Sequence, residues 1–330
     1  MNANWDAVDL FAGPGGWDLA AAAMGIRAVG LEWDAAAVAT RTAAGHATIR
    51  TDVAAYPTGP LAGIRGLIAS PVCTTYSVAG AGAGRTDMPL VQQAVADLAV
   101  GRDSRAALRA ECADARSLLA AEPMRFAADL RPEWVVLEQT PAALPLWRQT
   151  AEVLTGWGYS AWCGVVQAAD FGVPQTRRRA VLLASRLRQV SAPVPTHCAD
   201  PGVGLFAGPQ PWVSMGAALA DSRQVSFTVV SNYGSGGDPK ARGLRTSEQP
   251  AFTLTSKWAR NRLIDGDGAD LPRLTPSEAG VLQGFPADYP WQGRDVALQI
   301  GNAVPPPMAA AVLSAATGIP AAVPQLAVTR

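Results

Sequence analysis

The chain has 330 residues, of which 49% are hydrophobic and 16% charged, with 32 glycines and 26 prolines dispersed along it. This composition supplies a sizeable apolar core and excludes disordered, collagen-like and low-complexity chains. Lysine and arginine together number 27, as do aspartate and glutamate, so the net charge is zero and there is no global basic field. A nucleic-acid partner would therefore have to be held by a local cationic patch.

Strand-like and helix-like segments alternate along the first half of the chain. The predicted strands lie at 8–12, 28–32, 66–69, 134–137 and 180–183. The predicted helices between them lie at 17–24, 34–44, 90–100 and 104–130. This alternation predicts an α/β fold with a parallel sheet covered on both faces.

The amino-acid composition of the sequence changes near residue 186. From 186 to 271 the chain is rich in Pro, Gly and Ser, with short β-like pieces at 224–230 and 251–255. We interpret 1–185 as the first domain and 186–271 as a smaller, irregular, β-rich second domain.

Helical order resumes after the second domain. Residues 275–278, Thr-Pro-Ser-Glu, form a capping box with proline at the first helical position, and Gly284 is expected to end that helix. A final alanine-rich helix is predicted after Pro307. The uncharged run 308–328 is too broken by glycine and proline to predict a membrane span.

The cysteines indicate whether the chain could bind a metal, and together with the N-terminal residues they predict where the protein is located in the cell. The four cysteines are Cys73, Cys112, Cys163 and Cys198. With no C-x-x-C pair and only two histidines in the sequence, we expect no metal site. The start, MNANWDAVDLF, has no basic region followed by an apolar stretch, so no signal peptide is expected. Free thiols without an export signal predict a cytoplasmic protein.

A glycine-rich loop follows the first predicted strand. Gly13, Gly15 and Gly16 lie between that strand and a helix, where glycines let the backbone approach a ligand closely. The spacing is not G-x-G-x-x-G, so a dinucleotide is not specifically indicated. Taken alone, these glycines fit a ligand loop and a mere tight turn about equally well.

Acidic residues at the next two strand ends favour the ligand loop. Glu32 ends the second strand, where a carboxylate can accept hydrogen bonds from ribose hydroxyls. Trp33 could stack on a base, and Asp52 could accept from an exocyclic amine. Together with the glycines they predict a nucleoside-bearing cofactor.

A candidate nucleophile lies at the same predicted sheet edge. Cys73 follows the strand 66–69 in SPVCTTYS, and the glycine-rich stretch AGAGAGR after it suits a mobile lid. Taken alone, such a cysteine is more often a small buried hydrophobe, which is our interpretation of the other three. Glu138 ends the strand WVVLE, and beside a nucleophile this residue could donate a proton rather than serve as a solvated cap. In QTRRR, Arg177 and Arg179 share one side of an extended segment.

These patterns together resemble the DNA cytosine carbon-5 methyltransferase family. DLFAGPGGW is similar to its cofactor loop, LEW and TDV to its adenosine contacts, and PVC to its Pro-Cys nucleophile motif. EQT is similar to its Glu-Asn-Val motif and GVPQTRRR to its Gln-x-Arg-x-Arg motif. LTPSEAGVLQGFP and QIGNAVPPPMA resemble its two C-terminal motifs. Seven motifs occur in the family's order over residues 5–190 and 272–316, and 186–271 occupies the place of its target-recognition domain.

The resemblance implies a fold and a cofactor. The fold is a Rossmann-like methyltransferase domain with a mostly parallel, doubly wound sheet, to which residues 272–330 return. The cofactor is S-adenosylmethionine. The implied cofactor-binding residues are Asp9, Phe11, Gly13, Gly15, Gly16, Glu32, Trp33, Asp52, Pro71, Asn302 and Ala303.

The resemblance also implies a reaction, methylation of carbon 5 of a cytosine flipped out of duplex DNA. Cys73 would add to carbon 6, which makes carbon 5 reactive. Glu138 would hold or protonate ring nitrogen 3 and bind the exocyclic amine. Arg179 would orient the base, and Arg177 would hold a backbone phosphate or the loop.

Three positions depart from the family's usual residues. The chain has Pro-Val-Cys-Thr where the family usually has Pro-Pro-Cys-Gln, so Val72 and Thr74 differ on either side of the nucleophile. Gln139 and the threonine after it replace the usual Asn-Val. None of these changes removes a reacting group.

Cations concentrate in the second domain. They are Arg223, Lys240, Arg242, Arg245, Lys257, Arg260 and Arg262. Within this stretch, residues 223–262, the acidic residues are Asp238 and Glu248, so seven minus two gives a local charge of +5. A charge run is often only a solvated face, but the interleaved aromatic residues favour a DNA-recognition surface. The expected DNA contacts are Thr74, Ser77, Arg85, Arg242, Arg245, Lys257 and Arg260.

Three alternatives stay open from sequence. One is an RNA methyltransferase of the same chemistry, another a catalytically silent DNA-binding relative, and the most distant a nicotinamide-dependent oxidoreductase. We expect a monomer that acts on double-stranded DNA, with no membrane partner. A cognate restriction endonuclease acting on the same site is a further candidate partner.

Overall fold

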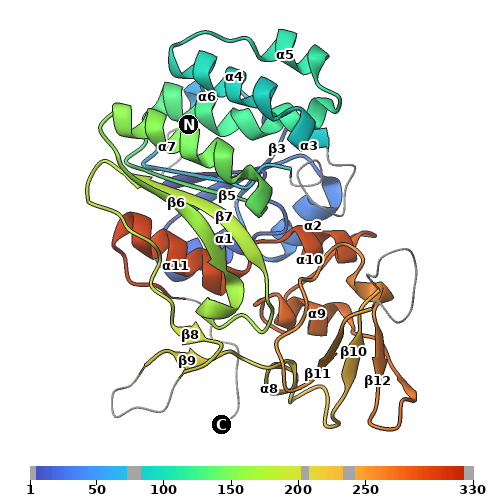
Figure 1. The fold of residues 1–330 in the computed structure, drawn as a ribbon. Coiled ribbons are helices and arrows are strands. Elements are labelled where there is room, and N and C mark those ends of the chain that lie inside the picture. Colours follow the sequence, from blue (N-terminus) through green and yellow to red (C-terminus); the bar gives the residue numbers. More distant parts are fainter. Residues whose placement is uncertain (1–4, 73–82, 202–207, 233–241, 323–330) are drawn as a thin grey trace.

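The structure is a computed structural model that describes residues 5–72, 83–201, 208–232 and 242–322 (Figure 1). Its centre is a seven-stranded sheet in the order β3-β2-β1-β4-β5-β7-β6. The strands are β1 Ala7–Leu10, β2 Ala28–Glu32, β3 Thr48–Arg50, β4 Gly66–Ala69, β5 Trp134–Gln139, β6 Ser160–Gln167 and β7 Arg178–Ser185. The first five run parallel, and β7 runs antiparallel to both its neighbours. The mostly parallel α/β sheet predicted from sequence is confirmed.

Helices cover both faces of this sheet (Figure 1). The helices of the described residues are α1 Gly16–Ala23, α2 Ala35–Ala43, α3 Ala83–Thr86, α4 Met88–Ala99, α5 Arg105–Glu111, α6 Glu122–Leu130, α7 Leu144–Gly156, α8 Met215–Ala218, α9 Pro276–Leu282, α10 Val296–Asn302 and α11 Pro306–Thr317, and α8, α9 and α10 belong to the β-rich part. Leu67 and Val135 belong to the core cluster that contains α4, α6 and α7. Their chain neighbours Ile68 and Val136 belong to the cluster that contains α1 and α11. Successive strand residues point to opposite faces, so each buried strand feeds both layers.

Two predictions of secondary structure were wrong in detail, and two elements were not predicted. The single helix expected over 104–130 is interrupted between α5 and α6, where Ala115–Ala121 forms a 3-10 segment capped by Asp114. The strand expected over 251–255 is only one isolated bridge, between Gln175 and Ala251. The strand β6 and the helix α7 were not predicted. β6 is an edge strand that is mostly half-buried and contains a glycine, so it lacks the apolar run by which β4 and β5 were recognised.

The β-rich part of the chain builds a separate small sheet in the order β11-β10-β12-β13. Its antiparallel strands are β10 Thr228–Val230, β11 Leu244–Thr246, β12 Arg262–Ile264 and β13 Asp270–Leu271, and β8 His197–Cys198 pairs separately with β9 Gln210–Pro211. The core of this region is shared, because Phe227 and Leu263 pack in one cluster with Leu282 of α9 and Ile300 of α10. The helix α11 returns to the central sheet and packs against β5 and β7.

The C-terminal helices begin and end as the sequence signals predict. The side chain of Thr275 accepts from Glu278 N while Glu278 bonds back to Thr275, which is the predicted capping box. Gly284, with φ 89°, follows α9. Within the described residues, the apolar stretch Val296–Thr317 has the length and hydropathy of a membrane span, yet 67% of its most apolar window is buried inside the protein. It consists of α10 and α11, which are separated by residues 303–305.

Candidate active site

A cavity of about 440 Å³ lies at the carboxyl ends of the parallel strands. Each strand contributes a lining residue from its end: Phe11 after β1, Glu32 from β2, Asp52 after β3, Pro71 after β4 and Glu138 from β5. The carboxyl ends of parallel strands meet at one edge of a sheet, which is why residues far apart in sequence gather here. The volume lies in the range that cofactor and ligand sites occupy.

The glycine loop forms one wall of the cavity through an unusual backbone. Phe11, Gly13 and Gly15 have positive φ angles of 60°, 54° and 107°. Gly13 and Gly16 line the cavity, whereas Gly15 does not. A Cβ on Gly16 would lie 2.0 Å from the carbonyl oxygen of Val304, another lining residue, so glycine is required for the C-terminal segment to pack against the loop.

Glu32 orders the loop and keeps acceptor capacity. Its Oε1 accepts from the backbone N–H groups of Trp33 at 2.9 Å and Asp34 at 2.8 Å, and its Oε2 accepts from Gly13 N at 2.8 Å. A carboxylate offers about four acceptor positions, so one position on Oε2 is left for a ligand hydroxyl. The lining position of Glu32 fits the predicted ribose contact.

The neighbouring lining residues suit an adenine ring. The indole of Trp33 is 73% exposed although it lines the cavity, which leaves its face open to a planar ligand. Asp52 accepts from Ala54 N through Oδ1. Its Oδ2 takes part in none of the hydrogen bonds formed among the described residues, which leaves an acceptor for an amine.

Asp9 lies behind the loop and not in the cavity. Its side chain is 0% exposed, and within the described part of the chain it has no bond as a carboxylate. Burial raises the pKa of Asp9 well above its usual range, and the nearby Asp18 raises it further. Asp18 itself is paired with the buried Arg41, at 2.6 and 2.8 Å. A direct contact between Asp9 and a bound cofactor, predicted from sequence, is therefore not what this geometry offers.

Glu138 and Arg179 form an ion pair in the wall of the cavity, with 2.8 Å between Oε1 and Nε. Glu138 is opposite Val181 across the antiparallel strands β5 and β7, so Arg179, two residues before Val181, lies on the same face. The two side chains are only 8% and 10% exposed. A planar polar ligand that enters here would meet a carboxylate already oriented by a guanidinium.

Arg177 lines the same cavity but binds the protein backbone. Its Nη1 donates to the carbonyl of Leu254 at 2.9 Å and its Nη2 to that of Gly301 at 2.8 Å. The side chain is almost fully buried. From the sequence, Arg177 was predicted to hold a backbone phosphate of DNA or the loop. In the structure its side chain instead links the β-rich part to the end of α10.

The segment that leads to Cys73 reaches the cavity. Pro71 and Val72 line it, and Gln139 Nε2 donates to the carbonyl of Pro71 at 2.8 Å. Gln139, which stands where the family usually has asparagine, thus links the end of β5 to this segment. Cys73 itself, Thr74 and Ser77 lie outside the described residues.

The C-terminal segment supplies a wall that sequence reasoning recognised only in part. Asn302 and Ala303 line the cavity as predicted, and so do Asp295, Leu298 and Gln299. The spacing of 295, 298, 299 and 302 is that of one helix face, a signal that could have identified the additional residues. Arg109 and Arg116 also reach the cavity, from α5 and the 3-10 segment, and no pattern in the sequence indicated it.

The predicted DNA-contacting cations fall into two groups. Arg245 donates through Nη1 to Thr176 Oγ1 and to the carbonyls of Pro250 and Ala251, and it lies over the ring of Phe252. It is therefore engaged with the protein, so it was a poor candidate for DNA. Two further cations of the stretch form ion pairs with acids, Arg223 with Glu278 and Arg262 with Asp270. Apart from Arg245, the described cations of this group without an ion pair to a described acid are Arg242, Lys257 and Arg260, and Arg85 of α3 likewise forms none.

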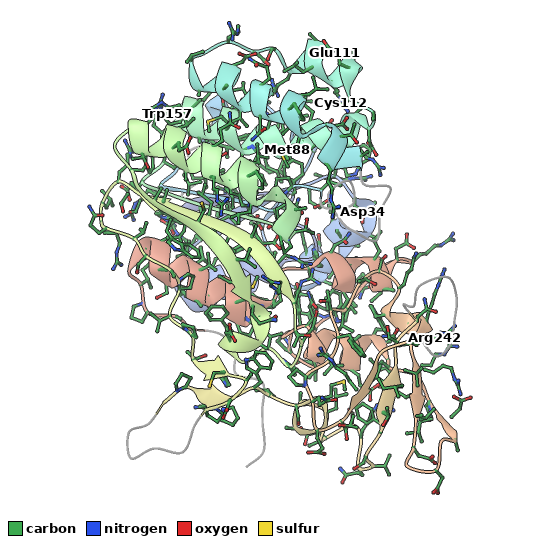
Figure 2. All side chains as sticks on the ribbon, in the orientation of Figure 1. Asp34, Met88, Glu111, Cys112, Trp157 and Arg242 are labelled. Atoms are coloured by element: carbon green, nitrogen blue, oxygen red, sulfur yellow. The ribbon has the colours of Figure 1, made fainter. Side chains whose placement is uncertain are left out.

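The described cysteines lie away from the cavity. Figure 2 shows Cys112 in the helical layer, away from Arg242 in the β-rich part. Neither Cys112, Cys163 nor Cys198 lines the cavity. Burial raises the pKa of Cys112 and of Cys163, which disfavours the reactive thiolate at both.

Comparison with known sequences identifies similar proteins. The profile of the family described as "C-5 cytosine-specific DNA methylase" matches residues 103–200 and 213–317. The type II methyltransferase M1.HphI of Haemophilus parahaemolyticus is 31% identical over 182 residues, which cover 48% of this chain and 48% of that protein. M.SsoII of Shigella sonnei is 26% identical over 230 residues, which cover 63% and 59%. The chain thus spans about half the length of these curated relatives.

Solved structures share the fold. A protein assigned as a DNA modification methyltransferase of an E. coli prophage superposes with a TM-score of 0.62 at 16% identity, over 96% of this chain and 99% of that one. The Dnmt2 methyltransferase of S. pombe superposes with a TM-score of 0.60 at 13% identity, over 93% and 96%. At such identities the likeness establishes the Rossmann-like methyltransferase fold with its β-rich part, and nothing finer.

Proposed function

Because this chain belongs to the C-5 cytosine-specific DNA methylase family, we propose that it methylates carbon 5 of cytosine in duplex DNA at a specific sequence, with S-adenosylmethionine as donor. The observation that carries the proposal is the Glu138–Arg179 pair, which shares one cavity with the open acceptors of Glu32 and Asp52. A site for a base and a site for a nucleoside cofactor are thus continuous.

The residues around the cavity fit this cofactor. S-adenosylmethionine supplies a methyl group on a positively charged sulfur, which makes that methyl group electrophilic. Glu32 would accept from a ribose hydroxyl, Asp52 from the adenine amine, and Trp33 would cover the ring. The positive-φ loop around Gly13 would bring the backbone close to the amino-acid end.

The protein's own groups would activate the base. The Cys73 thiolate would form a bond to carbon 6, and the electrons displaced from the 5,6 double bond would make carbon 5 nucleophilic enough to take the methyl group. A base would then remove the carbon-5 proton, and the electrons left behind would restore the double bond as the carbon–sulfur bond breaks. The thiolate would return to its starting state, the carbon-5 proton would stay on that base, and the electron pair of the broken sulfur–methyl bond would remain on the sulfur of the neutral product, S-adenosylhomocysteine, so atoms and charges balance.

Glu138 and Arg179 would stabilise the adduct. Addition at carbon 6 places negative charge on the ring, and a proton shared between Glu138 and ring nitrogen 3 would neutralise it. Arg179 holds Oε1 of Glu138, which leaves the other oxygen to accept from the exocyclic amine. The base has to leave the duplex to reach this wall, because carbon 6 is covered in the stack.

Duplex DNA would lie against the β-rich part. Arg242, Lys257 and Arg260 provide cations for backbone phosphates there, with Arg85 on the catalytic side and Thr74 and Ser77 next to the nucleophile. The similarity to proteins named type II methyltransferases supports a cognate restriction endonuclease as a partner in the cell. We propose that the enzyme itself acts as a monomer.

Transfer of a labelled methyl group to nucleic acid tests the function. Bisulfite sequencing of DNA from cells that express the protein would identify the methylated cytosine and its surrounding sequence. Purified protein is then given labelled S-adenosylmethionine with a duplex of that sequence or with tRNA. We expect label in the duplex as 5-methylcytosine and none in tRNA. Label in tRNA alone would support the RNA enzyme, and no label in either would support the silent relative.

A further inference from the structure

Tyr289 contacts the glycine loop but does not line the cavity. Its hydroxyl donates to the carbonyl of Pro14, which is 275 residues earlier in the chain. Pro14 itself lines the cavity. The tyrosine is only 7% exposed, so the bond is sheltered from water.

An aromatic cluster fixes the ring of Tyr289. Its centroid lies 4.7 Å from that of Phe285 and 4.9 Å from that of Trp291, with tilted and edge-on geometries that favour aromatic pairs. Ala303, a lining residue of the cavity, packs in the same cluster. Thr40 of α2 binds the adjacent segment, since its hydroxyl accepts from Gln292 N at 2.9 Å. The hydroxyl of Tyr289 is therefore held in a defined position relative to the loop.

His46 and Gly15 complete the contact. The hydroxyl of Tyr289 lies 3.3 Å from Nε2 of His46. Since the tyrosine proton is given to Pro14, His46 donates to the tyrosine oxygen and its proton is on Nε2. Burial lowers the pKa of His46 and raises that of Tyr289, so both are neutral near pH 7. A Cβ on Gly15 would lie 2.6 Å from His46 Cδ2 and 2.9 Å from the tyrosine oxygen, so the loop rests directly on these two side chains.

We propose that Tyr289 is a positioning residue for the cofactor, which acts by holding the loop from Phe11 to Gly15 in its binding conformation. Three residues of that loop have positive φ, and one of them is a phenylalanine, for which this conformation is unfavourable. Without the hydroxyl the loop would sample other conformations, and the binding of the cofactor would have to order it again. The proposal rests on the proposed function in that the ligand is taken to be S-adenosylmethionine.

Removal of one oxygen tests the proposal, and the chain offers a matched control. Tyr289→Phe keeps the aromatic cluster and removes the bond to Pro14. Tyr159 is also a buried tyrosine whose hydroxyl donates to a proline carbonyl, that of Pro132, at 2.5 Å, and it does not line the cavity. Tyr159→Phe therefore removes a chemically similar bond at a place without contact to the loop.

Calorimetric titration with S-adenosylmethionine, in the absence of DNA, measures the effect on binding. We expect the Kd of Tyr289→Phe to rise about fivefold, because one hydrogen bond typically contributes that factor to an equilibrium constant. The Kd of Tyr159→Phe should stay within twofold. The KM for the cofactor should rise with the Kd, while kcat at saturating cofactor should change less than twofold. Equal affinities for both variants and the wild type would overturn the proposal and leave Tyr289 with a structural role only.

Hydrogen exchange of the protein without cofactor separates this inference from the proposed function. The amides of residues 12–17 should exchange faster in Tyr289→Phe than in the wild type, and Tyr159→Phe should leave them unchanged. Wild-type protein that fails to bind S-adenosylmethionine would refute the proposed function, while faster exchange at the loop would still support the restraint by Tyr289. Unchanged exchange in Tyr289→Phe would contradict the restraint itself.

Discussion

Glu138 and Arg179 lie on adjacent antiparallel strands, and their side chains meet in an ion pair of 2.8 Å at the edge of the cavity. The pair depends on β7 running against β5, since this register places Arg179 on the same face as Glu138. A carboxylate with one oxygen held in this way presents the other in a fixed direction. The proposed contact with the edge of an aminopyrimidine requires such an arrangement.

Glu138→Gln tests the chemical role of this carboxyl group. The amide keeps the size of the side chain but cannot give a proton to the base, so we expect kcat to fall about a hundredfold or more. Single-turnover methyl transfer measures this rate. The Kd for S-adenosylmethionine should stay within twofold, because Glu138 is assigned to the base. Turnover within a few fold of wild type would exclude Glu138 as the proton donor.

Arg177→Ala tests whether that arginine is structural. The change leaves the carbonyls of Leu254 and Gly301 buried without their donors, and we expect the free energy of unfolding to fall by about 2–4 kcal/mol. Urea denaturation measures it. The exposed neighbour Arg178 is the matched control, and Arg178→Ala should change stability by less than about 0.5 kcal/mol. Equal stabilities of the two variants would show that the buried contacts of Arg177 contribute nothing.

Asp9→Asn tests the buried carboxyl group behind the loop. Because the pKa of Asp9 is raised in the folded protein, the unfolded chain loses its proton first, near pH 3.9, and folding is then disfavoured increasingly as pH rises toward the folded pKa. Asparagine has no such proton to lose, and its amide can donate to Asp18 as a protonated Asp9 would.

The measurement is the urea midpoint of both proteins at pH 4.5 and pH 8. We expect the midpoint of Asp9→Asn relative to wild type to increase between these two values. A difference that does not depend on pH would mean that the pKa of Asp9 is not raised by folding.

Exposed cations of the β-rich part should contribute to DNA affinity through phosphates. Lys257→Ala and Arg260→Ala should each weaken binding about equally for all duplex sequences, and each should reduce the salt dependence of binding by about one unit of slope. Arg148→Ala removes the same charge from the exposed face of α7, in the part of the molecule opposite the β-rich sheet (Figure 1). A loss of affinity equal to that of this control would indicate a general charge effect instead of contact with DNA.

The placement of the strand-end residues could be predicted from the sequence. Glu32, Asp52 and Glu138 each lie at or just after a strand, and the topology of parallel sheets brings such positions to one edge. The capping box at Thr275 is likewise a local signal, and the structure contains it. Local sequence patterns predict the position of a residue when that position depends only on the strand or helix to which the residue belongs.

Contacts between distant segments could not be predicted in this way. The bond from Tyr289 to Pro14 joins residues 275 positions apart, and that from Arg177 to Gly301 joins residues 124 apart. Their partners are backbone carbonyls, which carry no side-chain pattern to recognise. Arg245 likewise donates to backbone carbonyls, those of Pro250 and Ala251, so its contacts could not be predicted from the sequence either.

Trapping of the reaction intermediate tests the central claim most directly. A duplex with 5-fluorocytosine at the methylated position is incubated with the protein and S-adenosylmethionine, and the digested complex is analysed by mass spectrometry. Fluorine cannot leave as the proton does, so we expect the methylated base to stay bonded to the peptide that contains Cys73, and Cys73→Ser to give no complex. A bond to any other cysteine, or no bond although the cofactor binds, would contradict the assignment of Cys73 as the nucleophile.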